Sequence, residues 1–253
     1  MSGHSKWATI KRKKGAADAR RGQLFTKLTR EITVSAREGG GDPESNFRLR
    51  LAVQRARAEN MPLDNIQRAI QRGAGGGEGG ANFEEIMYEA YGPHGVAVLV
   101  QALTDNRNRT VAEIRSIFTK GGGNLGETGS VAWMFDPRGL ILVEPGQGDD
   151  PDEISLAAID AGAEDVLVDD EGQVEIVTAF NDLKHVQDTL AAQKINITQA
   201  ERTMVPKTTV TLEEKGMEQI LRLVERLEEL DDVQTVYTNL DLTGAEELMA
   251  SMS

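Results

Sequence analysis

The sequence predicts an α+β protein of three domains: an N-terminal helical bundle followed by two α/β sandwich domains, the third inserted in the second. Residues 1–72 show helical periodicity and carry 16 Lys/Arg against 7 Asp/Glu, a net charge of +9. Residues 73–80 are glycine-rich and predict a flexible linker. The remaining chain alternates strand-like and helical segments and carries 12 basic against 34 acidic residues, a net charge of −22. Because a basic region attracts polyanions and an acidic one repels them, we expect a nucleic acid to bind the N-terminal third.

Three helices are expected in the basic region. Over residues 23–38, apolar side chains fill one arc of the helix and Lys/Arg side chains fill the neighbouring arc. A second helix is expected from Asp42, as N-cap, and Pro43, at the first helical position. A third helix, capped by Asp64, is expected to end before Gly73. The second helix has two apolar stripes, which predicts a place at the centre of the bundle. The stripes are Phe47, Leu51 and Ala58 on one side and Leu49, Ala52, Val53 and Ala56 on the other.

Strand-like runs begin after the linker. Residues 83–91 and 96–103 are joined by a Gly-Pro-His-Gly turn signal, and a helix over 110–120 follows, with Thr110 and Glu113 spaced as a capping box. Near the end of the chain, residues 207–212 look extended, 215–230 helical and 233–237 extended again. Because these flanking pieces have a matching count of elements, we expect them to form one domain around an insertion.

The inserted segment has the pattern ββαββαβ over residues 131–204, close to a ferredoxin-like split β-α-β sandwich. Its first two strands are expected on either side of a turn at 136–139, which contains Pro and Gly. The expected domains are residues 1–79, residues 80–130 together with 206–253, and the inserted residues 131–205.

Composition favours a cytoplasmic protein without membrane contact. The chain has no cysteine, so disulfides and thiolate chemistry are excluded. Its apolar runs are far shorter than the ~20 residues of a membrane-spanning helix. No apolar segment follows the basic N-terminus, which argues against a secretory signal. No heptad seam predicts an oligomeric state.

Cations and one aromatic side chain gather near the start of the chain. Lys11–Lys14 form an unbroken run of four cations beside Trp7, and Arg20 and Arg21 follow. Cations bind phosphates, and an aromatic ring beside them can stack on an unpaired base. The alternatives are a solvated basic arm and a Trp7 that packs in the helical core. The predicted nucleic-acid-binding residues are Lys6, Trp7, Lys11, Arg12, Lys13, Lys14, Arg20, Arg21, Lys27 and Arg30.

No pattern typical of catalysis, metal binding or cofactor binding is found. The three histidines lie in different segments, and no cysteine can join them in a zinc site. Acidic turns such as Asp169-Asp170 could hold a hard metal, but solvated turn carboxylates are far commoner. Arg107 and Arg109, near the start of a helix, could bind an anion; alternatively the neighbouring Asp and Asn residues cap the turn while both arginines remain in water. We therefore predict no catalytic residue, no metal and no cofactor.

Several longer motifs resemble the YebC family, and the match covers the whole chain. They include Gly3-His4-Ser5-Lys6-Trp7, Phe25-Thr26-Lys27-Leu28, Arg30-Glu31-Ile32, Gly39-Gly40-Gly41-Asp42-Pro43, Asn60-Met61-Pro62, Arg68-Ala69-Ile70, Thr104-Asp105-Asn106-Arg107-Asn108-Arg109-Thr110, Gly121–Asn124 and Val131–Phe135. One departure is Phe47 after Asn46, where the family commonly has Pro.

The resemblance implies a helical N-terminal domain and two α/β domains, the third inserted in the second. It also implies cytoplasmic DNA-binding transcriptional regulators, with mitochondrial relatives that resemble translational activators and some bacterial members that act at the ribosome. We therefore expect a non-enzymatic, DNA-binding regulator of transcription. The alternatives are a translation factor that binds ribosomal RNA through the same cations and, further off, a metal-dependent nuclease. The acidic domains could contact a protein partner.

Overall fold

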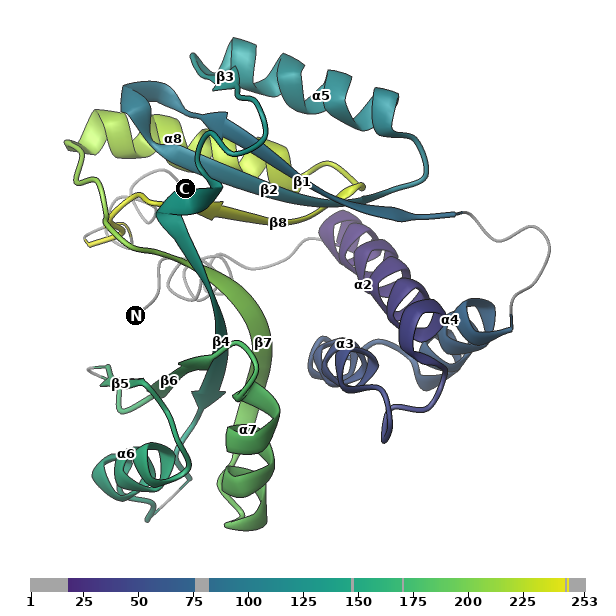
Figure 1. Ribbon diagram of the computed structural model, residues 1–253, viewed down its shortest axis with the longest axis vertical. Coiled ribbons are helices and arrows are strands. Elements are labelled where there is room, and N and C mark those ends of the chain that lie inside the picture. The colour runs from purple at the N-terminus through teal and green to yellow at the C-terminus, as the bar shows by residue number, and fades with distance from the viewer. Residues whose placement is uncertain (1–17, 76–81, 147, 170, 244, 246–253) are drawn as a thin grey trace.

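The computed structural model describes residues 18–75, 82–146, 148–169, 171–243 and 245, with side chains from Arg21 onward. Within these residues, a group of three helices lies beside two four-stranded antiparallel sheets (Figure 1). The predicted α+β class, with an N-terminal helical region and an insertion in the second domain, is confirmed.

The helical region consists of α2 (Asp18–Gly39), α3 (Phe47–Ala58) and α4 (Leu63–Ala74). α4 runs two residues beyond its predicted end, because Gly73 is buried within the helix rather than in the linker. Many apolar side chains of the three helices meet in one core. Its buried members include Leu28, Ile32, Leu49, Val53, Ile66 and Ala69.

The predicted N-cap of α3 is wrong. The helix is capped by Asn46, whose Oδ1 accepts a hydrogen bond from the backbone N–H of Leu49 at 3.1 Å. The Asn46 amide also donates to the carbonyl oxygens of Ser35 at 2.7 Å and Gly40 at 2.8 Å. Asn46 therefore fixes the end of α2 and the start of α3 together, a tertiary role that local sequence cannot reveal.

The start of α4 also differs from its prediction. Pro62 occupies the position before the helix, and Asp64 lies inside the first turn. Asp42, the other expected cap, instead accepts the backbone N–H of Glu44 at 3.0 Å in a turn that precedes α3.

The two apolar stripes of α3 do face two neighbours, but only one of these is in the helical bundle. Leu49 and Val53 pack against α2 and α4, whereas Phe47 and Leu51 pack into the core of the second sheet. Gln54 of α3 accepts a hydrogen bond from Gln187 at 3.0 Å, across the same contact. α3 therefore lies between two domains rather than at the centre of one.

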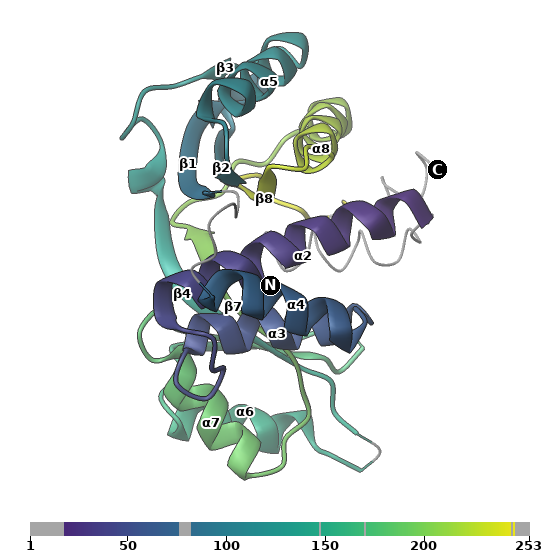
Figure 2. The same ribbon diagram turned by 90° about the vertical axis from the view of Figure 1, so that its right-hand side faces the viewer.

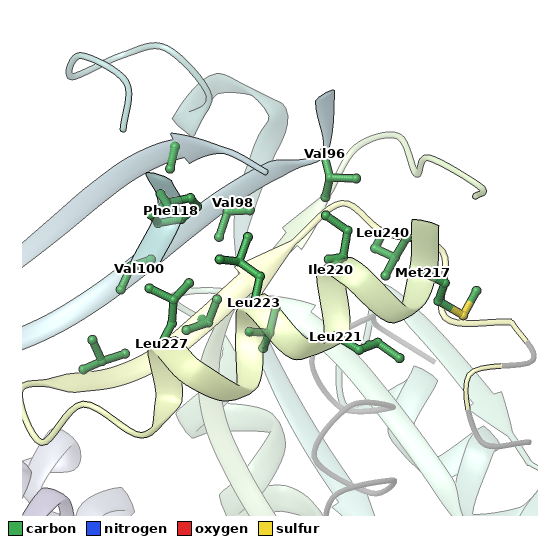
Figure 3. Packing of buried hydrophobic residues seen from close by; sticks show 14 of the residues in the cluster. Val96, Val98, Val100, Phe118, Met217, Ile220, Leu221, Leu223, Leu227 and Leu240 are labelled. Carbon is green, nitrogen blue, oxygen red and sulfur yellow. The ribbon is translucent and has the colours of Figure 1, made fainter. Parts of the chain in front are cut away.

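The first sheet has the strand order β3-β1-β2-β8. β1 (Glu84–Tyr91) and β2 (Ala97–Thr104) form a hairpin, and β3 (Asn124–Leu125) and β8 (Val233–Thr238) lie at the two edges. α5 (Arg107–Lys120) and α8 (Glu214–Glu228) cover one face (Figure 1). Figure 3 shows the buried side chains that pack between these helices and the sheet. Its labelled residues include Val98 and Val100 of β2, Phe118 of α5, and Leu223 and Leu227 of α8.

The second sheet lies in the sequence between β3 and β8, so it is inserted in the first. It contains β4 (Phe135–Val143), β5 (Asp165–Val168), β6 (Val174–Ala179) and β7 (Ile197–Pro206), in the order β5-β6-β4-β7. α6 (Pro151–Asp160) and α7 (Leu183–Ala192) pack on one face. This is the βαββαβ order of a ferredoxin-like fold.

The predicted turn at Asp136–Gly139 is wrong, because one strand runs through it. Pro137 is tolerated since pairing with β6 begins only at Arg138, and β4 has a single neighbour before that point. A Cβ at Gly139 would lie 2.3 Å from Thr178 Oγ1 and 2.7 Å from Leu183 Cβ. This glycine therefore lets α7 approach the sheet closely, rather than making a turn.

Candidate nucleic-acid interface

Most of the predicted nucleic-acid-binding residues lie outside what the structure describes. Those outside are Lys6, Trp7, Lys11, Arg12, Lys13 and Lys14, together with the side chain of Arg20. Arg21 is exposed on the first turns of α2. Lys27 and Arg30 are half-buried further along α2. The assignment of all ten to nucleic-acid binding stays a prediction.

Lys27 and Arg30 face the C-terminal end of α8. Lys27 Nζ donates to the carbonyl oxygen of Glu228 at 2.5 Å, and Arg30 donates to the carbonyl oxygen of Asp231. Gln23 adds a third contact, from its Nε2 to the carbonyl oxygen of Glu229 at 3.1 Å. The last carbonyl groups of a helix lack partners and carry partial negative charge, so cations stabilise them. In this arrangement the two cations hold α2 against the first sheet domain.

Asp232 is the centre of a buried polar cluster beside this contact. Its carboxylate lies 2.8 Å from Arg30 and 2.6 Å from Arg109, and accepts hydrogen bonds from Thr110 at 2.7 Å and Thr104 at 3.1 Å. Burial by itself raises the pKa of Asp232, but these hydrogen bonds and the charge of Arg30 outweigh burial, so the pKa lies below its ordinary value. The carboxylate is therefore charged and joins three separate elements.

The Arg107/Arg109 segment is part of this cluster rather than an anion site. α5 starts three residues before the predicted capping box, with Asn106 as its cap, accepting the N–H of Arg109 at 3.1 Å. Arg109 binds both Asp232 and Asp105, so its charge is already neutralised. Arg107 is exposed and lies 3.8 Å from Glu84. The sequence suggested either an anion site or arginines left in water beside a capped turn. Neither interpretation includes the buried carboxylate of Asp232, which is more than a hundred positions further along the chain.

Two arginines of α3 also serve contacts between domains. Arg48 lies within 3.0 Å of Glu31 and 2.9 Å of Glu85, joining α3 to α2 and to β1. Arg50 lies 3.4 Å from Asp188 of α7. Because the two arginines are partly buried, we expect these ion pairs to contribute more to stability than fully solvated surface pairs do. Much of the positive charge of the helical region is thus directed inward.

Some cations of this region remain exposed. Within the described residues, six exposed arginines of α2, α3 and α4 form no ion pair with a carboxylate. The amphipathic pattern of α4 could have identified two of them, because they lie opposite its apolar positions. The six are Arg21, Arg37, Arg55, Arg57, Arg68 and Arg72.

The described residues contain neither a metal-binding cluster nor a membrane-spanning helix. No group of three or more His, Asp or Glu side chains among them could hold a metal ion. In the same part of the chain, no helix has the length and apolarity that a membrane crossing requires.

Family comparisons agree with this arrangement of domains. The family described as "TACO1/YebC protein N-terminal domain" matches residues 5–76, and "TACO1/YebC second and third domain" matches residues 83–240. A Herpetosiphon aurantiacus relative named "Probable transcriptional regulatory protein" is 57% identical over 243 residues, covering 96% of both chains. A Moorella thermoacetica relative of the same name is 57% identical over 246 residues, covering 97% of both.

A solved structure is also similar. The crystal structure of a conserved hypothetical protein from Aquifex aeolicus matches with a TM-score of 0.80 and 46% identity, covering 88% of this chain and 91% of that one. The two matched regions together take in the helical region and both sheets. The chain therefore belongs to the TACO1/YebC family.

Proposed function

We propose that this protein is a non-enzymatic, cytoplasmic regulator of gene expression that binds duplex DNA through its basic N-terminal region and adjusts transcription. The observation that carries the proposal is the separation of charge, +9 over residues 1–72 against −22 over the rest. Neutralising phosphates with clustered cations releases counterions, which favours binding at that end alone. The name "Probable transcriptional regulatory protein" of its relatives supports the same role.

A salt titration tests the proposal. Replacing Lys11, Arg12, Lys13 and Lys14 by Ala should weaken binding to duplex DNA and reduce the slope of log affinity against log salt by about 3.6, or 0.9 per lost phosphate contact. The matched control removes four exposed cations from the acidic body, at Arg115, Lys120, Lys215 and Arg226. If both variants change affinity equally, net charge rather than the N-terminal region governs binding.

A second candidate is a translation factor that binds ribosomal RNA. It is favoured by the position of α3, which is held between the bundle and the second sheet and so cannot act as the recognition helix of a helix-turn-helix. Sedimentation with ribosomes at physiological salt, where duplex DNA no longer binds, would support this candidate over transcription. Cleavage of DNA that requires Mg²⁺ and Asp169 would instead support a nuclease.

A further inference from the structure

α4 has one face packed against its neighbours and one face in solvent. Ile66, Ala69 and Gly73 are buried against α2 and α3. The opposite side of the helix is exposed, and Figure 2 shows α4 in front of α3, facing the viewer. Over two turns this exposed side presents Gln67, Arg68, Gln71 and Arg72, which we call the α4 outer face.

The helix is held rigidly in this position. A Cβ at Gly73 would lie 2.2 Å from the carbonyl oxygen of Thr33 and 2.8 Å from Ala36 Cβ, so the backbones of α4 and α2 are in close contact. Thr33 Oγ1 also donates to the carbonyl oxygen of Ala69 at 3.4 Å. Side chains on a rigid element meet a ligand with little loss of conformational freedom.

The other two helices of the bundle, α2 and α3, contact other domains. α2 contacts the end of α8 through Lys27 and Arg30, and α3 packs into the second sheet through Phe47 and Leu51. Among the described helices of this region, α4 is thus the one whose polar side is not used for docking between domains.

The chemistry of the α4 outer face suits DNA. Glutamine can form two hydrogen bonds with N6 and N7 on the major-groove edge of adenine, and arginine can form two with O6 and N7 of guanine or with a phosphate. Arg68 donates to the carbonyl oxygen of Asp64 at 3.2 Å and to the side chain of Asn65, so it lies along the helix surface without an ion pair in the described residues. The face therefore carries uncompensated positive charge, complementary to a phosphate backbone.

We propose that the α4 outer face enters the major groove of duplex DNA, with Gln67 and Gln71 contacting bases and Arg68 and Arg72 contacting phosphate or guanine. The B-form major groove admits an α-helix, whereas the deep, narrow major groove of A-form RNA does not. This inference rests on the proposed function, because it specifies how the same region binds DNA.

The test is fluorescence anisotropy of the full chain with a 30-bp DNA duplex of mixed sequence and an RNA duplex of the same sequence. The double variant Arg68→Ala/Arg72→Ala should lower DNA affinity about tenfold or more and reduce the salt slope by about 1.8. RNA duplex binding should stay unchanged. The matched control, Arg115→Ala/Lys120→Ala, removes the same charge from exposed positions on α5. Circular dichroism and thermal unfolding check that each variant is folded.

A variant that leaves the charge unchanged distinguishes contacts with bases from electrostatic attraction to phosphates. Gln67→Ala/Gln71→Ala should retain affinity for mixed-sequence DNA within about threefold, yet lose any motif that wild type enriches from a randomised duplex pool. If the arginine pair behaves like its α5 control, or weakens RNA and DNA duplex binding equally, the inference is overturned. In that case, if the Lys11–Lys14 variant still loses DNA binding, the proposed function stands and only the role of α4 is rejected. Absence of DNA binding by wild type would overturn both.

Discussion

The guanidinium of Arg30 lies 2.8 Å from the carboxylate of Asp232, and this ion pair joins the N-terminal helical region to the first sheet. The side chain of Asp232 is 4% exposed and that of Arg30 is 16% exposed. The same carboxylate binds Arg109 and Thr110 at the start of α5. One acidic residue near the C-terminus thus fixes two elements that are distant in sequence.

Asp232→Asn should lower the free energy of unfolding by about 2–3 kcal/mol. The change removes the charge that compensates Arg30 and Arg109, and breaking a buried charged pair is costly. The loss stays below the upper range for fully buried pairs because Arg109 is partly exposed to water. Urea unfolding measures the change.

The neighbouring residue supplies the control for this variant. Asp231 is exposed and accepts a hydrogen bond from Arg30 through its backbone carbonyl oxygen, which Asp231→Asn leaves in place. This variant should stay within about 0.5 kcal/mol of wild type. Equal effects of the two substitutions would contradict a special role for the buried carboxylate.

Stability should depend on pH through Asp232 and Glu89, whose pKa values both lie below their ordinary values of 3.8 and 4.5. For Glu89, burial raises the pKa, but backbone N–H groups of Gly129, Val131 and Ala132 lower it by more. A depressed pKa contributes stability that is present above the unfolded-state pKa and is lost as pH falls through the folded-state pKa.

Glu89 contributes equally to wild type and Asp232→Asn, so the difference in their unfolding free energies should follow Asp232 alone, staying constant well above pH 3.8 and shrinking as pH falls below it. Urea titrations at a series of pH values measure it. A difference that instead grew on acidification would mean that the carboxylate is easier to protonate when folded.

Two glycines of the helical region should respond in opposite directions to alanine. Gly73→Ala should destabilise the protein by about 1–3 kcal/mol, because its Cβ would lie 2.2 Å from the carbonyl oxygen of Thr33. Gly22→Ala should stabilise it by up to about 1 kcal/mol, since Gly22 is helical and exposed and its added Cβ meets nothing within 4 Å. Thermal unfolding of both variants measures the two effects, close packing at Gly73 and helix propensity at Gly22. A Gly73→Ala variant more stable than wild type would show that α2 and α4 can move apart.

For much of the candidate site, the sequence predicted that cations are present but not which groups they contact. The cation run at Lys11–Lys14 stands out in the sequence because its members are adjacent. The partners of Lys27 and Arg30 could not be predicted, because Glu228 and Asp232 are about two hundred positions away along the chain. The amphipathic pattern of α4 could have located Arg68 and Arg72.

The sequence by itself determined where most helices and strands form, because burial of one side of an element imposes a repeat of apolar residues, and it determined which end carries positive charge. Tertiary structure decided what each turn-like or cationic residue does. Pro137 and Gly139 lie within a strand because pairing with β7 and packing of α7 outweigh their local preference for turns. Asn46 rather than Asp42 caps α3 because the end of α2 holds its amide. Arg30 meets a carboxylate because two distant segments exclude water together, and that proximity has no signature in the order of residues.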